Sequence, residues 1–346
     1  MPKGFYSQGL CILLSEPVSL DQMERALAKS GLKISGRQDG SDDELIDVPS
    51  LIMPYDQGDD GQIMISLLDR EWPDDMGDPE DQPEVFVAWS LGQYGPLAYP
   101  GCLERATEQS WAWEDSGQKV GEHRCFIRVL CSYVIGVESD DAPLLPDDYD
   151  AMAELEYLTK IVSSLLELPQ ALCYFNPGGE VLRDEDGLRE GLNYAWNHHL
   201  PALDMWTNVR LFKATDEWSL MDTVGNGQFD LPDIEAAFLT EKYDLADIEK
   251  FLRNASLTML KTGDVFEEGD MADGAGTAVW RALVCEDALT DPPRPTIRWF
   301  PNDDTEVPEE LTDTGLTDQE VEAELEELTD FDDIDFDDSD DTEYPF

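Results

Sequence analysis

Oxygen-bearing side chains in the second half of the chain follow a spacing that could bind a calcium ion. Asp222, Asn226, Asp230 and Asp233 would supply positions one, five, nine and twelve of an EF-hand loop, with Gly227 at the sharp turn of position six. Calcium is bound by such carboxylate and amide oxygens. These four residues are therefore the candidate metal ligands, and a calcium-binding loop at 222–233 is one hypothesis for the function.

Two departures from the EF-hand pattern argue against calcium. Position three is Val224, which has no side-chain oxygen, and position twelve is Asp233 in place of the longer, bidentate Glu. An EF-hand also needs an entering helix, whereas residues 208–221 are typical of strands. The structural alternative is a glycine turn into a helix that begins at Pro232, because proline suits the first helical position. We therefore predict no bound metal and no cofactor.

A second group of carboxylates could do acid–base chemistry. Beside Trp72 the chain carries Asp74, Asp75, Asp78 and Glu80. An enzyme of unrecognised class, such as a hydrolase, would use this loop or His123 as a general acid or base. In a chain with 78 acidic residues, however, close carboxylates are expected by chance, and a solvated loop is the favoured interpretation. No nucleophile, phosphate-loop or zinc-protease motif occurs in a fitting context, so the sequence favours a non-enzymatic protein.

The C-terminus offers a different chemistry, that of protein binding. An acidic run containing Asp340 and Asp341 ends in Tyr344, Pro345 and Phe346. The terminal ring can be buried in a partner, its carboxylate can pair with Arg or Lys, and the aspartates can attract a basic surface. These five residues are the predicted partner-binding residues. The alternative is a solubilising tail whose last residues are incidental.

This ending resembles the C-terminal tip of bacterial single-stranded-DNA-binding proteins, an acidic peptide that ends in Ile-Pro-Phe. The resemblance covers about ten residues; Tyr344 replaces Ile, and the aspartates are less compact. It implies that the terminal Phe inserts into an apolar pocket ringed by basic residues on a partner protein. Nothing upstream has the basic, aromatic strands of a nucleic-acid-binding barrel. The resemblance therefore supports a basic protein partner rather than direct binding of nucleic acid.

Charge excludes several classes of function. The 346 residues include 78 Asp or Glu and 22 Lys or Arg, a net charge of −56, and residues 302–346 hold 21 of the acids and no base. Nucleic acids and anionic membranes need a basic surface, so we expect neither as a partner. No apolar run approaches the roughly 18 residues of a spanning helix. The acid excess also fits a host with high internal salt, and the oligomeric state is left open.

Six cysteines, at 11, 102, 125, 131, 173 and 285, show no CxxC spacing. Most lie in apolar, strand-like runs, as buried free thiols do. Zinc would need clustered Cys and His. We therefore predict reduced structural thiols and a cytoplasmic location.

Hydrophobic periodicity predicts an α+β fold with mixed or antiparallel sheets and packed helices, in two halves of similar size. The predicted units are 1–140, 141–301 and a mostly disordered acidic tail, 302–346. Predicted strands are 9–14, 32–35, 44–55, 62–68, 122–137, 171–175, 180–182, 205–213, 217–221, 256–260, 277–285 and 295–300. Predicted helices are 19–30, 84–93, 101–114, 148–167, 184–198, 232–240, 244–254 and, within the tail, 318–328.

Several short segments of the second half are similar to a bacterial family of unknown function, number four-two-six-one in the domain-of-unknown-function series. The match runs over roughly residues 150–275 and includes Ala171–Phe175, Met205–Phe212, Asp222–Gly225, Asp233–Glu235, Phe251–Ala255 and Gly263–Asp270. The N-terminal strand Cys11–Ser15 also fits. The resemblance implies an α+β fold and brings no known catalytic residues. The leading prediction is thus an interaction or accessory protein whose acidic tail docks a basic protein partner.

Overall fold

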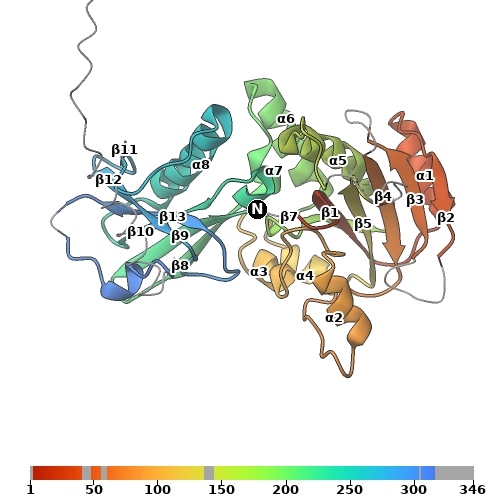
Figure 1. The fold of residues 1–346 in the computed structure, drawn as a ribbon, viewed down its shortest axis with the longest axis horizontal. Helices are drawn as coiled ribbons and strands as arrows, with labels where there is room; N and C mark the ends of the chain where they lie inside the picture. Colours follow the sequence, from red (N-terminus) through yellow and green to blue (C-terminus); the bar gives the residue numbers. More distant parts are fainter. Residues whose placement is uncertain (1–2, 41–47, 56–60, 136–143, 304, 316–346) are drawn as a thin grey trace, which may run out of the picture.

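The protein is an α+β structure built on two β-sheets, as the sequence predicts (Figure 1). The computed structural model describes residues 3–40, 48–55, 61–135, 144–303 and 305–315. The predicted tail helix 318–328 and the partner-binding residues Asp340, Asp341, Tyr344, Pro345 and Phe346 lie outside the described residues.

The first sheet, sheet A, has seven strands, and every neighbouring pair is antiparallel. In spatial order the strands are β2 (Gly36–Gln38), β3 (Ser50–Pro54), β4 (Gln62–Leu68), β5 (Cys125–Ser132), β1 (Gln8–Leu14), β6 (Ala171–Asn176) and β7 (Val181–Arg183). The last two strands come from beyond residue 140. The predicted boundary near residue 140 therefore does not separate the two sheets, which divide between β7 and β8.

Helices cover both faces of sheet A (Figure 1). One face packs against α1 (Leu20–Lys29) and α5 (Ala151–Leu166), and the other packs against α2 (Pro83–Ser90) and α3 (Cys102–Glu108), which α4 (Ser116–Gly121) follows. Helix α1 begins as predicted with a capping box between Ser19 and Gln22.

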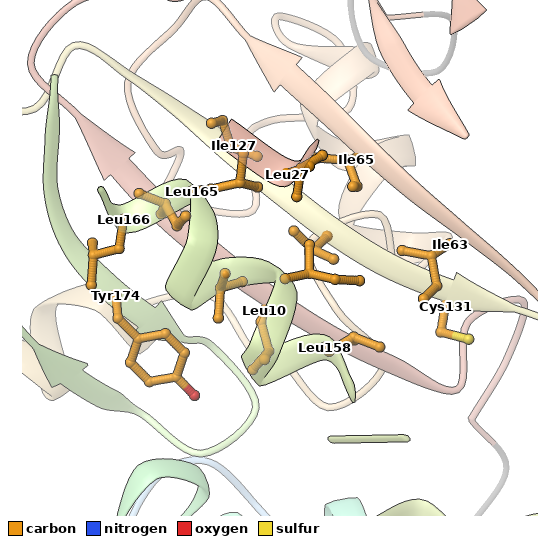
Figure 2. Close-up of a cluster of buried hydrophobic side chains, with 14 of the residues drawn as sticks. Leu10, Leu27, Ile63, Ile65, Ile127, Cys131, Leu158, Leu165, Leu166 and Tyr174 are labelled. Carbon is orange, nitrogen blue, oxygen red and sulfur yellow. The ribbon is translucent and has the colours of Figure 1, made fainter. Parts of the chain in front are cut away.

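Strand β1 shows why both faces are covered, because all of its residues are buried. Alternate side chains point to opposite faces of a strand. Leu10 and Ile12 belong to the core under α1 and α5, whereas Cys11 and Leu13 belong to the core on the other face. Figure 2 shows the first of these cores, where Leu158 and Leu165 of α5 approach the sheet side chains.

The second sheet, sheet B, has six strands in a mixed arrangement. In spatial order they are β11 (Met271–Asp273), β12 (Val279–Cys285), β13 (Thr296–Pro301), β10 (Asp233–Leu239), β9 (Trp218–Val224) and β8 (Asn208–Lys213). Only the β10–β13 pair is parallel among the described strands. One face of sheet B packs against α8 (Leu245–Thr262), through Ile248, Leu252 and Met259. Helices α6 (Glu185–His198) and α7 (Leu203–Trp206) lie between the two sheets in sequence and in space (Figure 1).

The other face of sheet B is covered by the chain after β13. We call residues 302–315, without the undescribed 304, the strap. Leu311 of the strap is 4% exposed and joins a core cluster with Trp218, Leu220 and Ala237. Arg298 donates to the carbonyl oxygens of Leu311 and Asp313 at 3.0 and 2.6 Å. The segment predicted to be a tail from residue 302 is therefore part of the fold up to Gly315.

Several predicted elements are wrong or misplaced. Residues 32–35 precede β2 and form no strand, and the helix predicted at 101–114 ends at Glu108 as α3. Residues 232–240 form strand β10, after a short 3₁₀ turn (Asn226–Phe229), and not a helix. Residues 256–260 are the last turns of α8 and not a strand. The strand predicted to begin at 205 begins at Asn208, since α7 occupies Leu203–Trp206. Among the described residues, no helix has the length and apolarity to cross a membrane.

Candidate functional site

Asp222, the first residue of the candidate calcium loop, is fully buried among arginines. Its Oδ1 accepts a hydrogen bond from Arg210 Nε at 3.0 Å, and its Oδ2 accepts from Arg210 Nη2 and Arg294 Nη2, each at 2.6 Å. The Thr290 hydroxyl donates to the same Oδ2. Both carboxylate oxygens are thus occupied by donors from β8 and from the segment before β13.

The strand register explains how this contact forms. Arg210 on β8 is opposite Asp222 on β9, Asp222 is opposite Glu235 on β10, and Glu235 is opposite Arg298 on β13. We call these four residues the charge row. Each is at most 1% exposed, and Arg298 Nε lies 2.7 Å from Glu235 Oε2. Cross-strand neighbours of opposite charge therefore pair across sheet B beneath the strap and the segment before β13.

The remaining candidate calcium ligands also have protein partners. Asp233 accepts from the Thr223 hydroxyl at 2.8 Å and from the Asn226 backbone N–H at 3.0 Å, and it pairs with Arg294 at 3.2 Å. The Asn226 amide donates to Ser256 Oγ at 2.9 Å. Asp230 pairs with buried Lys3 at 3.1 Å. The described residues contain no group of three or more His, Cys, Asp or Glu side chains that could hold a metal.

Burial and the arginines shift these carboxyl groups in different directions. Burial alone would raise the pKa of Asp222, but Arg210 and Arg294 outweigh it and lower that pKa below its ordinary value. For Asp233 and Glu235, burial prevails over their arginines and raises the pKa. Of the two carboxylates in the charge row, Asp222 is therefore the one whose ionised form the arginines stabilise beyond the cost of burial.

The charge row is also connected to sheet A. The Glu180 carboxylate, in the turn before β7, lies 2.9 Å from Arg210 Nη1 and 2.8 Å from Arg105 Nε of α3. Asn208 at the start of β8 donates to the Glu180 carbonyl oxygen at 2.9 Å. This network joins the two sheets, and its charged groups pair with one another.

The candidate catalytic groups near Trp72 hold the loop in place. Asp74 accepts from the backbone N–H groups of Leu103 and Glu104 at 2.9 and 2.7 Å, at the start of α3. Asp78 accepts from two backbone N–H groups of its own turn. His123 Nε2 accepts from the Trp72 N–H at 3.0 Å, and its Nδ1 faces the Val120 carbonyl oxygen. These side chains do not converge on a shared pocket that the structure describes.

The net negative charge of the protein lies outside the described interior. The described interior holds five cations and five acids that cancel: Lys3, Arg128, Arg210, Arg294 and Arg298, with Glu154, Glu180, Asp222, Asp233 and Glu235. Removing five from each of the totals of 22 and 78 leaves 17 bases and 73 acids. The entire net charge of −56 thus falls on the remaining residues.

A hollow at one end of sheet B gathers several of these acids. Its wall begins where α8 ends at Gly263, whose φ of 76° reverses the chain and whose N–H bonds to the Met259 carbonyl oxygen. The following segment runs beside β12, where Gly269 N–H bonds to the Ala282 carbonyl oxygen and Ala282 N–H to that of Asp270. Glu268 Oε2 accepts from the Val284 N–H at 2.7 Å, which fixes the loop against the strand.

We call this hollow the acidic groove; its volume is about 1010 Å³. Its lining is Gly263, Asp264, Val265, Phe266, Glu267, Glu268, Asp270, Leu283, Val284, Glu286 and Thr314. Five carboxylates and no described Lys or Arg line it. Val265 and Val284 are 45% and 40% exposed, so apolar surface lies among the acids.

The carboxylates of the acidic groove divide into two kinds. Glu268 accepts a backbone hydrogen bond from Val284 of β12, and Asp270 accepts one from Glu267 within the loop. Asp264, Glu267 and Glu286 are exposed, and their carboxylates make no hydrogen bond or ion pair with the described residues. These three are available to a cationic partner.

The strap ends beside the acidic groove. The Thr314 carbonyl oxygen accepts from the Glu286 N–H at 2.9 Å, and Thr314 itself lines the groove. The chain therefore passes the groove immediately before it continues into residues 316–346. The acidic groove was not predicted from the sequence, because its residues come from three separate segments, 263–270, 283–286 and Thr314. Its one local signal is the acidic run Glu267, Glu268 and Asp270 beside Val265.

Residues 222–300 match a family model described as Domain of unknown function (DUF4261). The match covers less than a quarter of the chain and lies further toward the C-terminus than the predicted 150–275. It includes α8, β10 to β13 and every lining residue of the acidic groove except Thr314. No curated protein and no solved structure matches the chain.

Proposed function

We propose that the protein is a non-enzymatic binding protein that docks a basic protein partner through its acidic C-terminal surface. The observation that carries the proposal is the acidic groove. Its lining combines exposed valines with three carboxylates that have no partner among the described residues, and it includes Thr314, close to the start of the acidic tail. The finer roles of Tyr344, Pro345 and Phe346 belong to this proposal.

The acidic groove has the chemistry that recognises Lys and Arg side chains. These side chains combine an apolar stem with a charged head, so the stem can pack on Val265 and Val284 while the head pairs with Asp264, Glu267 or Glu286. A groove with acidic walls also focuses the field of the whole protein and speeds the encounter with a basic surface.

The tail would act as a second contact linked to the first. Residues 316–346 include 15 Asp or Glu and no base, and they end in Tyr344-Pro345-Phe346. Two linked contacts bind more tightly than either contact alone, because the second binding event becomes intramolecular. Phe346 would add apolar burial and a terminal carboxylate to the charges of the groove.

A cytoplasmic location is part of the proposal. All six cysteines are free and buried, and they form no disulfide in the structure. Free buried thiols are usual in a reducing compartment.

Affinity purification from the native cells tests the function with matched variants. The groove variant D264K/E267K/E286K reverses the three unpaired carboxylates. The control E108K/E114K/E190K makes the same change in total charge at exposed acids of other surfaces. We expect a basic protein to co-purify in stoichiometric amount with the natural chain and the control, and to be reduced severalfold with the groove variant.

A chain that ends at Glu343 separates the tail from the groove. We expect it to retain less of the same partner than the full chain. Partner sets that are identical for the natural chain, the groove variant and the shortened chain would contradict the proposal.

A further inference from the structure

A second hollow lies between α5 and α6, outside the family match. These two helices lie away from β11 and β12 in Figure 1. Its volume is about 720 Å³, within the range of roughly 300–1,000 Å³ that is usual for pockets of small molecules. We call it the α5–α6 hollow. The charged network and the partner-binding surface described above do not use it.

The end of α6 forms the apolar side of this hollow. His199 follows the helix with a φ of 54°, and the chain reverses so that the Leu200 N–H bonds to the Ala195 carbonyl oxygen at 3.0 Å. Because of this reversal, Leu200 and Ala202 run back beside α6. Together with Ala195 and Leu192 they give the hollow an aliphatic wall.

Two tryptophans line the hollow in contrasting ways. Trp206 is fully buried, and its Nε1 donates to Thr159 Oγ1 of α5 at 2.9 Å, so its ring is fixed. Trp196 on α6 is 82% exposed, the largest exposure among the described large apolar side chains. A ligand could therefore cover the Trp196 ring, which the folded chain leaves in water.

The α5 side of the hollow carries three charged residues. Glu156, Lys160 and Glu167 line it, and none forms an ion pair or side-chain hydrogen bond with the described residues. Burial raises the pKa of Glu156, and negatively charged Asp150 raises it further. A cation placed beside Glu156 would offset this partial burial. Glu167 lies eleven residues along the helix, about 16 Å away, so the two carboxylates are separate positions.

Electrostatics selects the charge of the ligand. Lys160 is the one described Lys or Arg lining the hollow, and His199 is the one other group there that can become positive. The two carboxylates outnumber Lys160, and the protein as a whole has a net charge of −56. This field raises the local concentration of cations and repels anions.

We propose that the α5–α6 hollow binds an organic ammonium ion carried on an aromatic ring. The ring packs on Trp196 and the aliphatic wall, and the ammonium group pairs with Glu156. Cation–π attraction to the exposed indole adds to this pairing.

Isothermal titration calorimetry on the full chain tests the proposal with three probes that share a phenyl ring. They are phenethylammonium, benzyl alcohol and 3-phenylpropionate, which carry a positive, no and a negative charge. We expect phenethylammonium to bind at one site at least about tenfold more tightly than the other two, which is about 1.4 kcal/mol. Equal binding of all three probes would overturn the proposal. So would the absence of saturation by phenethylammonium at about 20 mM, because a dissociation constant above that concentration is too weak for a functional site.

Variants then locate the site. Trp196→Ala and Glu156→Gln should each weaken phenethylammonium binding by about threefold or more. Both side chains are at the surface, so thermal unfolding should remain close to that of the natural chain. Glu190→Gln removes an exposed charge of α6 outside the hollow and should leave binding unchanged. Undiminished binding by Trp196→Ala would place the probe elsewhere and overturn the proposal.

Lys160 gives the sharpest comparison. Lys160→Met removes the competing cation of the α5 wall, so phenethylammonium should bind more tightly. Two results would mean that the hollow recognises an acidic group and would overturn the proposed ligand class. One is weaker binding of phenethylammonium by this variant, and the other is tighter binding of 3-phenylpropionate than of phenethylammonium by the natural chain.

Discussion

Arg210 binds Asp222 through two guanidinium nitrogens, Nε at 3.0 Å and Nη2 at 2.6 Å, and both side chains are fully buried. Arg294 binds the same carboxylate from the opposite end of the domain-of-unknown-function match, at 2.6 Å. Asp222 therefore satisfies two buried cations that come from distant parts of the sequence.

Replacing Asp222 should destabilise the fold strongly. Asp222→Asn keeps the volume but removes the carboxylate that Arg210 and Arg294 share, so that Arg210 keeps only the carboxylate of Glu180 and Arg294 only that of Asp233. The free energy of unfolding should fall by about 3–5 kcal/mol. Urea unfolding followed by circular dichroism measures this. The control Asp216→Asn breaks only the exposed Lys213–Asp216 pair and should cost less than about 1 kcal/mol. Equal losses of unfolding free energy in the two variants would show that the charge row does not contribute strongly to the stability of the fold.

Calcium should not stabilise the protein. The carboxylates of Asp222 and Asp233 are already engaged by arginines and backbone N–H groups, so an ion would have to displace them. The melting temperature should be the same with about 5 mM calcium chloride as with a chelator. This calcium concentration is above the Kd of most protein calcium sites. A calcium-dependent rise that Asp222→Ala abolishes would restore the hypothesis of a calcium loop at 222–233.

The pH dependence of stability should reveal Glu154. This carboxyl group is buried and accepts from Ser7 Oγ and Tyr133 Oη, both at 2.9 Å, and burial raises its pKa above the ordinary value of 4.5. Because the native state then holds the proton more tightly than the unfolded state, Glu154 favours folding at low pH. Its contribution falls as pH rises through the interval between the unfolded and folded pKa values.

The comparison with Glu154→Gln, whose side chain does not titrate, isolates this effect. The unfolding free energy of the natural chain minus that of the variant should decrease as pH rises above the ordinary pKa of 4.5. A difference that increases with pH would mean that the hydrogen-bond donors, not burial, control Glu154.

The strap should be part of the cooperative fold. Leu311→Ala removes a nearly buried side chain from the cluster with Trp218 and Leu220, and it should cost about 2–4 kcal/mol. A chain that ends at Gly315 keeps every strap contact described above and should unfold at the same temperature as the full chain. A large loss of stability in that shortened chain, or none from Leu311→Ala, would contradict this division between strap and tail.

Added salt should raise the melting temperature. The buried charges cancel, so the excess of acids outside the described interior produces repulsion that sodium chloride screens. Differential scanning calorimetry between about 0.02 and 0.5 M salt should show a steady rise, since the screening length shortens severalfold over that range. A falling melting temperature would indicate that ion pairs dominate instead.

Local patterns in the sequence predicted most of the helices and strands. The apolar stripe of Leu155, Leu158 and Val162 gives α5 as expected, and the apolar run at 9–14 gives β1. The errors come from distant contacts. Pro232 suggested the start of a helix, but Asp233 and Glu235 lie in a strand, where Arg294 and Arg298 neutralise them. Nothing near residue 233 in the sequence shows those partners.

The same limit applies to the candidate sites. The acidic groove joins the end of α8, β12 and the strap, and the α5–α6 hollow depends on a chain reversal at His199. The sequence showed the acids and tryptophans, but only the register and the helix ends show which of them face a common space. The predicted contact at Phe346 stays a prediction.

The dissociation constant of the co-purified basic protein tests the central claim most directly. It should be measured with the full chain, with D264K/E267K/E286K and with E108K/E114K/E190K, at about 0.05 and 0.3 M salt. We predict that only the groove variant weakens binding by more than about tenfold, and that salt weakens binding of the natural chain. Equal affinities for the two triple variants would show that the partner does not use the acidic groove.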